Sequence, residues 1–149
     1  MGLDNVATGR LAAYLLSRLS AGQTGTFGLI AGSLCYRAHC DRESGFLQLM
    51  QEKNWADRVM GVREGHDDPE SNYRQARLLL EQHPDLIGIY NIGGAPEGVA
   101  RALKEVRRDK KIVFVGHGLT SDVRALLIEG TLDAIIMQDP QQSILNCVR

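Results

Sequence analysis

The chain has 149 residues, of which 44% are hydrophobic, so it can bury a core of ordinary size without disulfides or a structural metal. Its 17 lysines and arginines balance 18 aspartates and glutamates, and neither sign forms a block, which argues against direct DNA or RNA binding by this chain. We expect residues 1–149 to form one domain with no linker.

Neither a membrane span nor a secretion signal is visible. No apolar run approaches the roughly 20 residues needed to cross a bilayer, and Met1 does not open onto a charged and then apolar segment. A cytoplasmic location with no membrane partner is therefore expected. Cys35, Cys40 and Cys147 make an odd count, which favours reduced thiols over a disulfide framework.

The first predicted element is an amphipathic helix. Asp4 suits its N-cap, apolar residues from Val6 to Leu19 recur at helical spacing, and Gly22 suits its end. After it, short apolar runs alternate with longer segments of helical period. The runs at residues 26–31, 59–62, 86–92, 112–115 and 132–137 predict five strands.

The segments between these runs predict helices with recognisable ends. The second helix carries Phe46, Leu49 and Met50 on its inner face. The later helices have caps, first-turn prolines and terminators in the expected order: Asp68-Pro69-Glu70 and His83-Pro84 for the third, Pro96 for the fourth, and Thr120, Ser121 or Asp122 with Gly130 for the fifth. Asp139-Pro140 predicts a sixth helix, with Ile144, Cys147 and Val148 facing inward.

Runs that are apolar on both faces, such as residues 27–31 and 112–115, indicate a parallel sheet covered by helices on each side. Right-handed crossovers then give an α/β fold with a doubly wound, mostly parallel five-stranded sheet, for which we predict the order 2-1-3-4-5. In such sheets the loops after the strands gather at one edge beside helix N-termini, so a ligand is expected there.

These loops carry side chains that suit a sugar or polyol. They are Arg37, His39, Asn91, His117, Gln138 and Asp139, beside the aromatic Tyr36. Groups that donate and accept in one plane pair with vicinal hydroxyls, and an aromatic face covers the apolar side of a sugar ring. Asn91 and Gln138 could equally stabilise turns, and Arg37 could be a solvated residue at a helix start, while Asp139 better suits a helix cap.

Other chemistries have less support. Cys35, His39 and Cys40 lack the spacing of a zinc site, so no metal is predicted. His117 has no carboxylate or nucleophile near it in the sequence, and residues 116–121 match the dinucleotide pattern G-x-G-x-x-G only in part, because Ser121 replaces the third glycine. No catalytic residue and no cofactor are predicted, and the chain is expected not to be an enzyme.

Several segments together resemble the effector-binding domain of the lactose-repressor (LacI) family, which shares its fold with periplasmic sugar-binding proteins. In chain order they are Asp4-Asn5 with Gly9-Arg10-Leu11-Ala12, Ile30-Ala31-Gly32-Ser33, Arg42-Glu43-Ser44-Gly45-Phe46, His83-Pro84-Asp85-Leu86, Ile89-Tyr90-Asn91, Phe114-Val115-Gly116-His117, Gly130-Thr131-Leu132-Asp133-Ala134 and Gln138-Asp139-Pro140. Their order and spacing carry the resemblance, which covers nearly the whole chain.

The resemblance implies the second, C-terminal lobe of a transcriptional regulator that senses a small molecule, a sugar or polyol. It implies that a helix-turn-helix headpiece, which binds operator DNA, and a first lobe, which completes the ligand cleft, are absent from this chain. It also implies a homodimer, through helices flanking the fourth and fifth strands. By this analogy the effector alters operator binding.

By position, the resemblance places Asn91, the His117-Gly118 pair and Gln138 at effector contacts. Gly118 stands where an acid is common in the family.

Cys40 stands where many members of the family place a ligand-gripping arginine six residues before an aromatic, here Phe46. Arg37 or His39, within one helical turn of Cys40, could supply the missing donor. The predicted ligand site is therefore Arg37, Cys40, Asn91, His117, Gly118 and Gln138.

Two alternatives remain open. A transport-associated sugar-binding protein has the same fold, and a secretion signal in the full gene product would favour it, whereas an upstream helix-turn-helix would favour the regulator. A small nucleotide-dependent enzyme would bind NAD or FMN at residues 116–121.

Overall fold

The computed structural model describes residues 4–33, 36–106, 108, 111–118, 120–139 and 142–146, with residues 138–139 and 142–146 described by their backbone alone. The α-helices are α1 (Asn5–Leu19), α2 (Arg37–Glu52), α3 (Pro69–Gln82), α4 (Pro96–Glu105) and α5 (Ser121–Glu129), and η1 (Ala56–Arg58) is a short 3₁₀ helix. The strands are β1 (Thr26–Ala31), β2 (Val59–Glu64), β3 (Leu86–Asn91), β4 (Val113–His117), β5 (Ala134–Asp139) and β6 (Gln142–Asn146).

The strands form one sheet in the order β2-β1-β3-β4-β5-β6. The first five are parallel to their neighbours, which confirms the predicted doubly wound sheet and its order 2-1-3-4-5. Two strands lie slightly later in the chain than predicted. As a result His117 is the last residue of β4, and Asp139 belongs to β5.

The predicted sixth helix is wrong over its described part. Gln142–Asn146 instead forms β6, which pairs antiparallel with β5, with Leu145 opposite Ile135. Asp139 therefore does not cap a helix. The edge of β5 offers unpaired backbone groups to any following segment that can turn back, and five residues around a β-branched isoleucine suit that edge. Cys147 and Val148, also assigned to this helix, lie outside the described residues.

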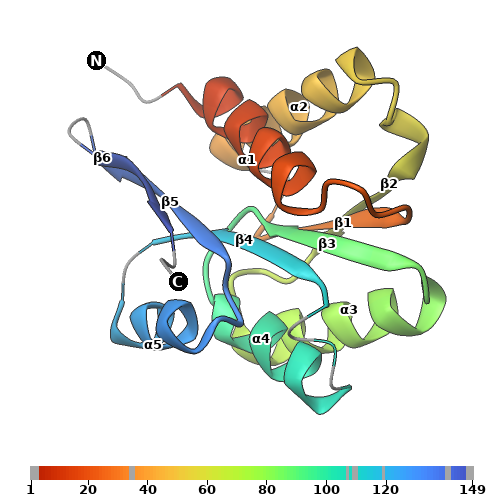
Figure 1. Ribbon diagram of the computed structural model, residues 1–149. Helices are drawn as coiled ribbons and strands as arrows, with labels where there is room; N and C mark the ends of the chain where they lie inside the picture. The colour runs from red at the N-terminus through yellow and green to blue at the C-terminus, as the bar shows by residue number, and fades with distance from the viewer. Residues whose placement is uncertain are drawn as a thin grey trace.

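Helices cover both faces of the sheet (Figure 1). α1 and α2 lie on one face, and α3, α4 and α5 lie on the other. Strand alternation separates the two cores: on β1, Phe27 and Leu29 pack on the α1–α2 side, whereas Ile30 packs on the α3–α4 side. Both sides of the central strands are thus buried, as the apolar runs indicate.

The predicted helix caps are confirmed where they are described. Asp4 accepts a hydrogen bond from the Ala7 N–H at the start of α1, Asp68 from the Ser71 N–H of α3, and Thr120 Oγ1 from the Val123 N–H of α5. Gly130 ends α5 in the left-handed conformation, with φ of 88°.

α1 and α2 approach each other backbone to backbone. A Cβ atom on Gly45 would lie 1.9 Å from the Val6 carbonyl oxygen, and one on Gly9 would lie 1.9 Å from the Arg42 carbonyl oxygen. Only glycine permits this contact. It fixes the first turns of α2 above the carboxyl edge of the sheet.

None of the helices in the described part of the chain is both long and apolar enough to cross a membrane.

Candidate functional site

Tyr90 and His117 meet at the carboxyl edge of the parallel strands. Tyr90 lies one residue before the end of β3, and His117 ends the neighbouring strand β4. Tyr90 Oη and His117 Nε2 share a hydrogen bond of 2.7 Å. The Tyr90 ring is fully buried and stacks on Phe46 of α2, with ring centroids 5.6 Å apart. This packing fixes where the imidazole lies.

His117 is uncharged near neutral pH. Burial, together with a smaller effect of the positive charge of Arg42, lowers its pKa to about 3, although a contact with the Ile136 backbone opposes the shift. Its Nδ1 atom is buried and has no hydrogen bond of good geometry within the described residues. His117 therefore brings a neutral ring to the site and no positive charge.

Arg42 supplies a positive charge at the same edge. Its Nη1 donates to the Ile92 carbonyl oxygen just beyond β3, at 2.7 Å, and its Nε donates to Asn5 Oδ1 in the first turn of α1, at 3.1 Å. The guanidinium thus joins α1, α2 and the end of β3. Burial raises the pKa of the Tyr90 phenol, and the nearby charge of Arg42 opposes that rise.

His39 closes the edge beside β1. Its Nδ1 accepts hydrogen bonds from the Gly32 and Ser33 N–H groups, at 3.1 and 3.3 Å, so the ring proton must lie on Nε2. Burial lowers the pKa of His39, the charge of Arg42 lowers it further, and Asp67 acts in the opposite direction. The Tyr36 ring meets the His39 ring edge-on at 5.3 Å and is itself exposed.

The loop from Gly93 to Ala95, after β3, is held from several sides. Asn91 Nδ2 donates to the Gly93 and Gly94 carbonyl oxygens, at 3.2 and 3.0 Å. Asn72 Nδ2, on α3, donates to the Gly94 and Ala95 carbonyl oxygens, at 3.0 and 2.9 Å. Of the two roles open to Asn91, the geometry gives it turn stabilisation, while its buried Oδ1 has no partner within the described residues.

Arg37 and Cys40 lie on the first turns of α2. The Arg37 side chain is 93% exposed and forms a long ion pair of 3.8 Å with Asp41. Cys40 is a partly exposed thiol, whereas Cys35 and Cys147 lie outside the described residues. The role of Arg37 and Cys40 as ligand contacts stays a prediction.

The remaining predicted positions, Gly118 and Gln138, follow β4 and end β5. Gly118 is exposed with φ of 90°, a left-handed conformation that favours glycine. The side chain of Gln138 lies outside the described part of the chain.

Arg42, Tyr90 and Asp67 were not among the predicted contacts. For Arg42 the sequence did contain a signal. Arg42 lies on one helical stripe with His39 and Phe46, which are both buried, whereas Cys40 lies off that stripe. Arg42 therefore provides a guanidinium two residues after the position expected from the resemblance. Tyr90 was missed because, in the sequence, it looks like any other apolar residue of the predicted strand at 86–92.

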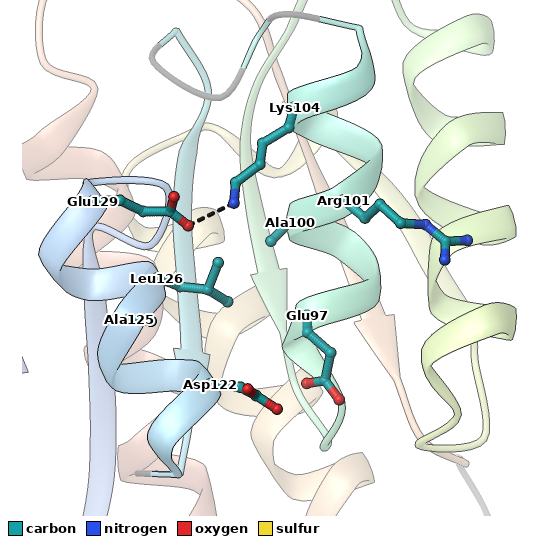
Figure 2. Close-up of a pocket in the computed structure, with 8 residues that line it drawn as sticks. All are labelled: Glu97, Ala100, Arg101, Lys104, Asp122, Ala125, Leu126 and Glu129. Atoms are coloured by element: carbon teal, nitrogen blue, oxygen red, sulfur yellow. Dashed lines mark hydrogen bonds and ion pairs between the residues drawn. The ribbon is translucent and has the colours of Figure 1, made fainter.

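A groove of about 300 Å³ lies elsewhere, between α4 and α5 (Figure 2). Lys104 Nζ and Glu129 Oε1 pair at 2.6 Å at one end, and Glu97 and Asp122 lie toward the other. Arg101 points away from the groove toward α3. None of the predicted site residues with described side chains lines this groove, so it is separate from the carboxyl-edge site.

The described side chains suit binding rather than metal chemistry. No group of three His, Cys, Asp or Glu side chains within the described residues could hold a metal ion. The edge instead combines a fixed guanidinium, two histidines with lowered pKa, an exposed aromatic ring and a rigid glycine loop. Such a surface defines a small-molecule binding domain of the doubly wound α/β class.

The chain belongs to the periplasmic binding protein domain family, which it matches over residues 1–148. No curated protein sequence matches it significantly.

Solved structures resemble it closely in fold. The glucose-galactose binding protein GanP from Geobacillus stearothermophilus superposes with a TM-score of 0.84 at 26% identity, covering 93% of this chain and 49% of that one. The sugar-binding protein of a sugar ABC transporter from Bacillus halodurans gives 0.81 at 25% identity, covering 90% and 46%. An ABC transporter solute binding protein from Agrobacterium vitis with bound D-fucose gives 0.81 at 23% identity, covering 90% and 46%.

This chain spans about half the length of these structures. They are described as binding proteins. The periplasmic-binding-protein fold implied by the sequence resemblance is therefore confirmed. The Bacillus halodurans and Agrobacterium vitis structures are described as binding proteins of ABC transporters.

Proposed function

We propose that this chain is a sugar-binding lobe whose ligand lies on the carboxyl edge of β1, β3 and β4. The observation that carries the proposal is the convergence of Arg42, His39 and the Tyr90–His117 pair at that edge. Charged and neutral donors fixed by packing suit ring hydroxyls, and the exposed Tyr36 suits the apolar face of a sugar. Similar structures described as binding glucose, galactose or D-fucose agree with this ligand class.

The lobe forms one wall of a cleft in this proposal. The superposition covers 93% of this chain but only 49% of GanP. In this proposal a second lobe of similar size closes on the ligand from the other side. The isolated lobe then binds sugars weakly, because it makes only part of the contacts.

For the protein as a whole, the comparisons favour a transport-associated sugar-binding protein. The LacI-like motif order favours the other candidate, a cytoplasmic, homodimeric regulator that reaches operator DNA through a separate headpiece. The gene sequence upstream of Met1 separates them: a secretion signal supports transport, and a helix-turn-helix supports regulation.

Ligand-observed NMR tests sugar binding directly. The 149-residue chain is mixed with millimolar D-galactose, D-glucose or L-arabinose, and with NAD as the probe of the enzyme alternative. We expect saturation transfer to at least one sugar and none to NAD. Transfer to NAD alone, or to none of these compounds, would overturn the proposal.

A matched pair of arginine variants locates the site. Arg42→Met should weaken sugar binding about tenfold or more, because a charge-assisted hydrogen bond contributes about 1.5–3 kcal/mol. Arg37→Met removes the same group from an exposed position on the same helix, and unchanged affinity of this variant would remove Arg37 from the predicted ligand site. Circular dichroism confirms folding, and Arg42→Lys, which keeps the charge, should bind with intermediate affinity. Equal affinity of Arg42→Met and wild type would remove Arg42 from the site.

A further inference from the structure

The loop between β2 and α3 folds over the end of β1 in an unusual conformation. His66 and Asp67 are consecutive non-glycine residues with positive φ, 58° and 56°. The Gly65 and His66 N–H groups donate to the Ala31 and Gly32 carbonyl oxygens, at 2.8 and 2.7 Å. Left-handed conformations of this kind cost free energy and are retained where the surroundings impose them, often at ligand sites.

This conformation carries the Asp67 carboxylate from the edge strand β2 to the centre of the sheet edge. Oδ1 accepts a hydrogen bond of 2.6 Å from the Gly94 N–H. A Cβ atom on Gly32 would lie 2.4 Å from Oδ1, and one on Gly93 would lie 2.3 Å from it. The carboxylate therefore rests above the ends of both β1 and β3, in space that two glycines leave open.

Asp67 faces the positive side of the site without forming an ion pair within the described residues. Burial lowers the pKa of both His39 and Arg42, and the negative charge of Asp67 opposes the shift in both. Asp67 is exposed, and the one hydrogen bond that its carboxylate makes within the described residues uses Oδ1, which leaves Oδ2 available there as an acceptor. The edge thus offers a carboxylate acceptor and a guanidinium donor to the same ligand.

We propose that Asp67 is a ligand-contacting residue that accepts a hydrogen bond from a sugar hydroxyl and selects neutral sugars over acidic ones. The inference rests on the proposed sugar-binding function and adds the residue that sets charge preference. A carboxylate binds a hydroxyl donor strongly and repels a uronate carboxylate.

Asp67→Asn tests this role with little change in structure. Asparagine tolerates positive φ, and its side-chain oxygen can still accept from the Gly94 N–H. We expect binding of the neutral sugar identified by NMR, with D-galactose as the first probe, to weaken about tenfold. The ratio of D-galacturonate to D-galactose affinity should rise. Asp67→Gly, which also suits positive φ, should weaken D-galactose binding at least as much.

Asp57→Asn is the control, because Asp57 is exposed on η1 before β2, at the opposite edge of the sheet. It makes the same change of charge and should leave both sugars unaffected. Unchanged D-galactose affinity in both Asp67 variants, or wild-type preference for D-galacturonate, overturns the role of Asp67 while leaving sugar binding intact. Failure of the wild type to bind any sugar overturns the proposed function itself.

Discussion

His117 shows how a single residue couples the site to folding. Its ring is placed by Tyr90, and burial and the charge of Arg42 keep it neutral. In the unfolded chain the same imidazole takes up a proton near its ordinary pKa of 6.5. Because the folded-state pKa is lowered, the unfolded state binds more protons between about pH 6.5 and pH 3, and acid in that range favours unfolding.

The first prediction concerns that pH range. Between pH 7 and pH 5, the free energy of unfolding should fall by up to about 1.4 kcal/mol per pH unit through His117 alone, once the pH is below 6.5. Urea denaturation of wild type and His117→Gln at pH 7, 6 and 5 measures the slope. The variant should have the shallower pH dependence, with the remaining slope due in part to His39 and carboxylates. Parallel slopes would mean that His117 titrates normally in the folded state.

At the scale of elements, the local sequence predicted the structure of a segment correctly where no distant part of the fold decided it. Asp4, Asp68 and Thr120 cap helices as predicted, since a cap depends on the two or three residues that follow it. The last segment was mispredicted because Asp139-Pro140 has the local signature of a helix start, whereas the open edge of β5 decides its structure. Secondary structure there depends on a partner that the local sequence does not contain.

The residues of the candidate site also differ in whether the sequence could predict their positions. The places of His117 and Asn91 at strand ends could be predicted, because strand-end positions follow from the sheet order, whereas their contact with a ligand stays a prediction. Arg42 depends on which face of α2 is buried, and Asp67 depends on a loop with two left-handed residues that place it above a different strand. Neither position follows from spacing alone.

The second prediction tests the contact between α1 and α2. Gly45→Ala would raise intrinsic helix propensity by about 1 kcal/mol. The added Cβ would nevertheless lie 1.9 Å from the Val6 carbonyl oxygen, so the helices must separate, and we expect a net destabilisation of at least about 2 kcal/mol. Ser44→Ala, at an exposed neighbouring position, should be neutral or slightly stabilising. Equal stability of both variants in thermal or urea denaturation would contradict the close approach.

At the scale of the molecule, two cores share one sheet. One core lies under α3, α4 and α5 and the other under α1 and α2, and adjacent residues of the same strands contribute to each. Neither core can lose its strands while the other keeps them. We expect the two faces to unfold together in one cooperative transition.

Trp55, the single tryptophan of the chain, makes this measurable. It packs with the α1–α2 core and stacks on Phe27, with ring centroids 6.1 Å apart. Phe114→Ala, on the opposite face of the sheet, should lower stability by about 3–5 kcal/mol and shift the urea midpoint of Trp55 fluorescence as far as that of far-UV circular dichroism. A fluorescence midpoint that stays at the wild-type value would show that the faces unfold independently.

The loop from Gly93 to Ala95 has a kinetic consequence. Its carbonyl oxygens accept from Asn91 and Asn72, and its Gly94 N–H donates to Asp67, so three different segments of the chain hold it in one shape. A preorganised surface loses little conformational entropy when a ligand arrives. Encounter should then govern the rate of association with this lobe, and differences in affinity among sugars should appear as differences in residence time.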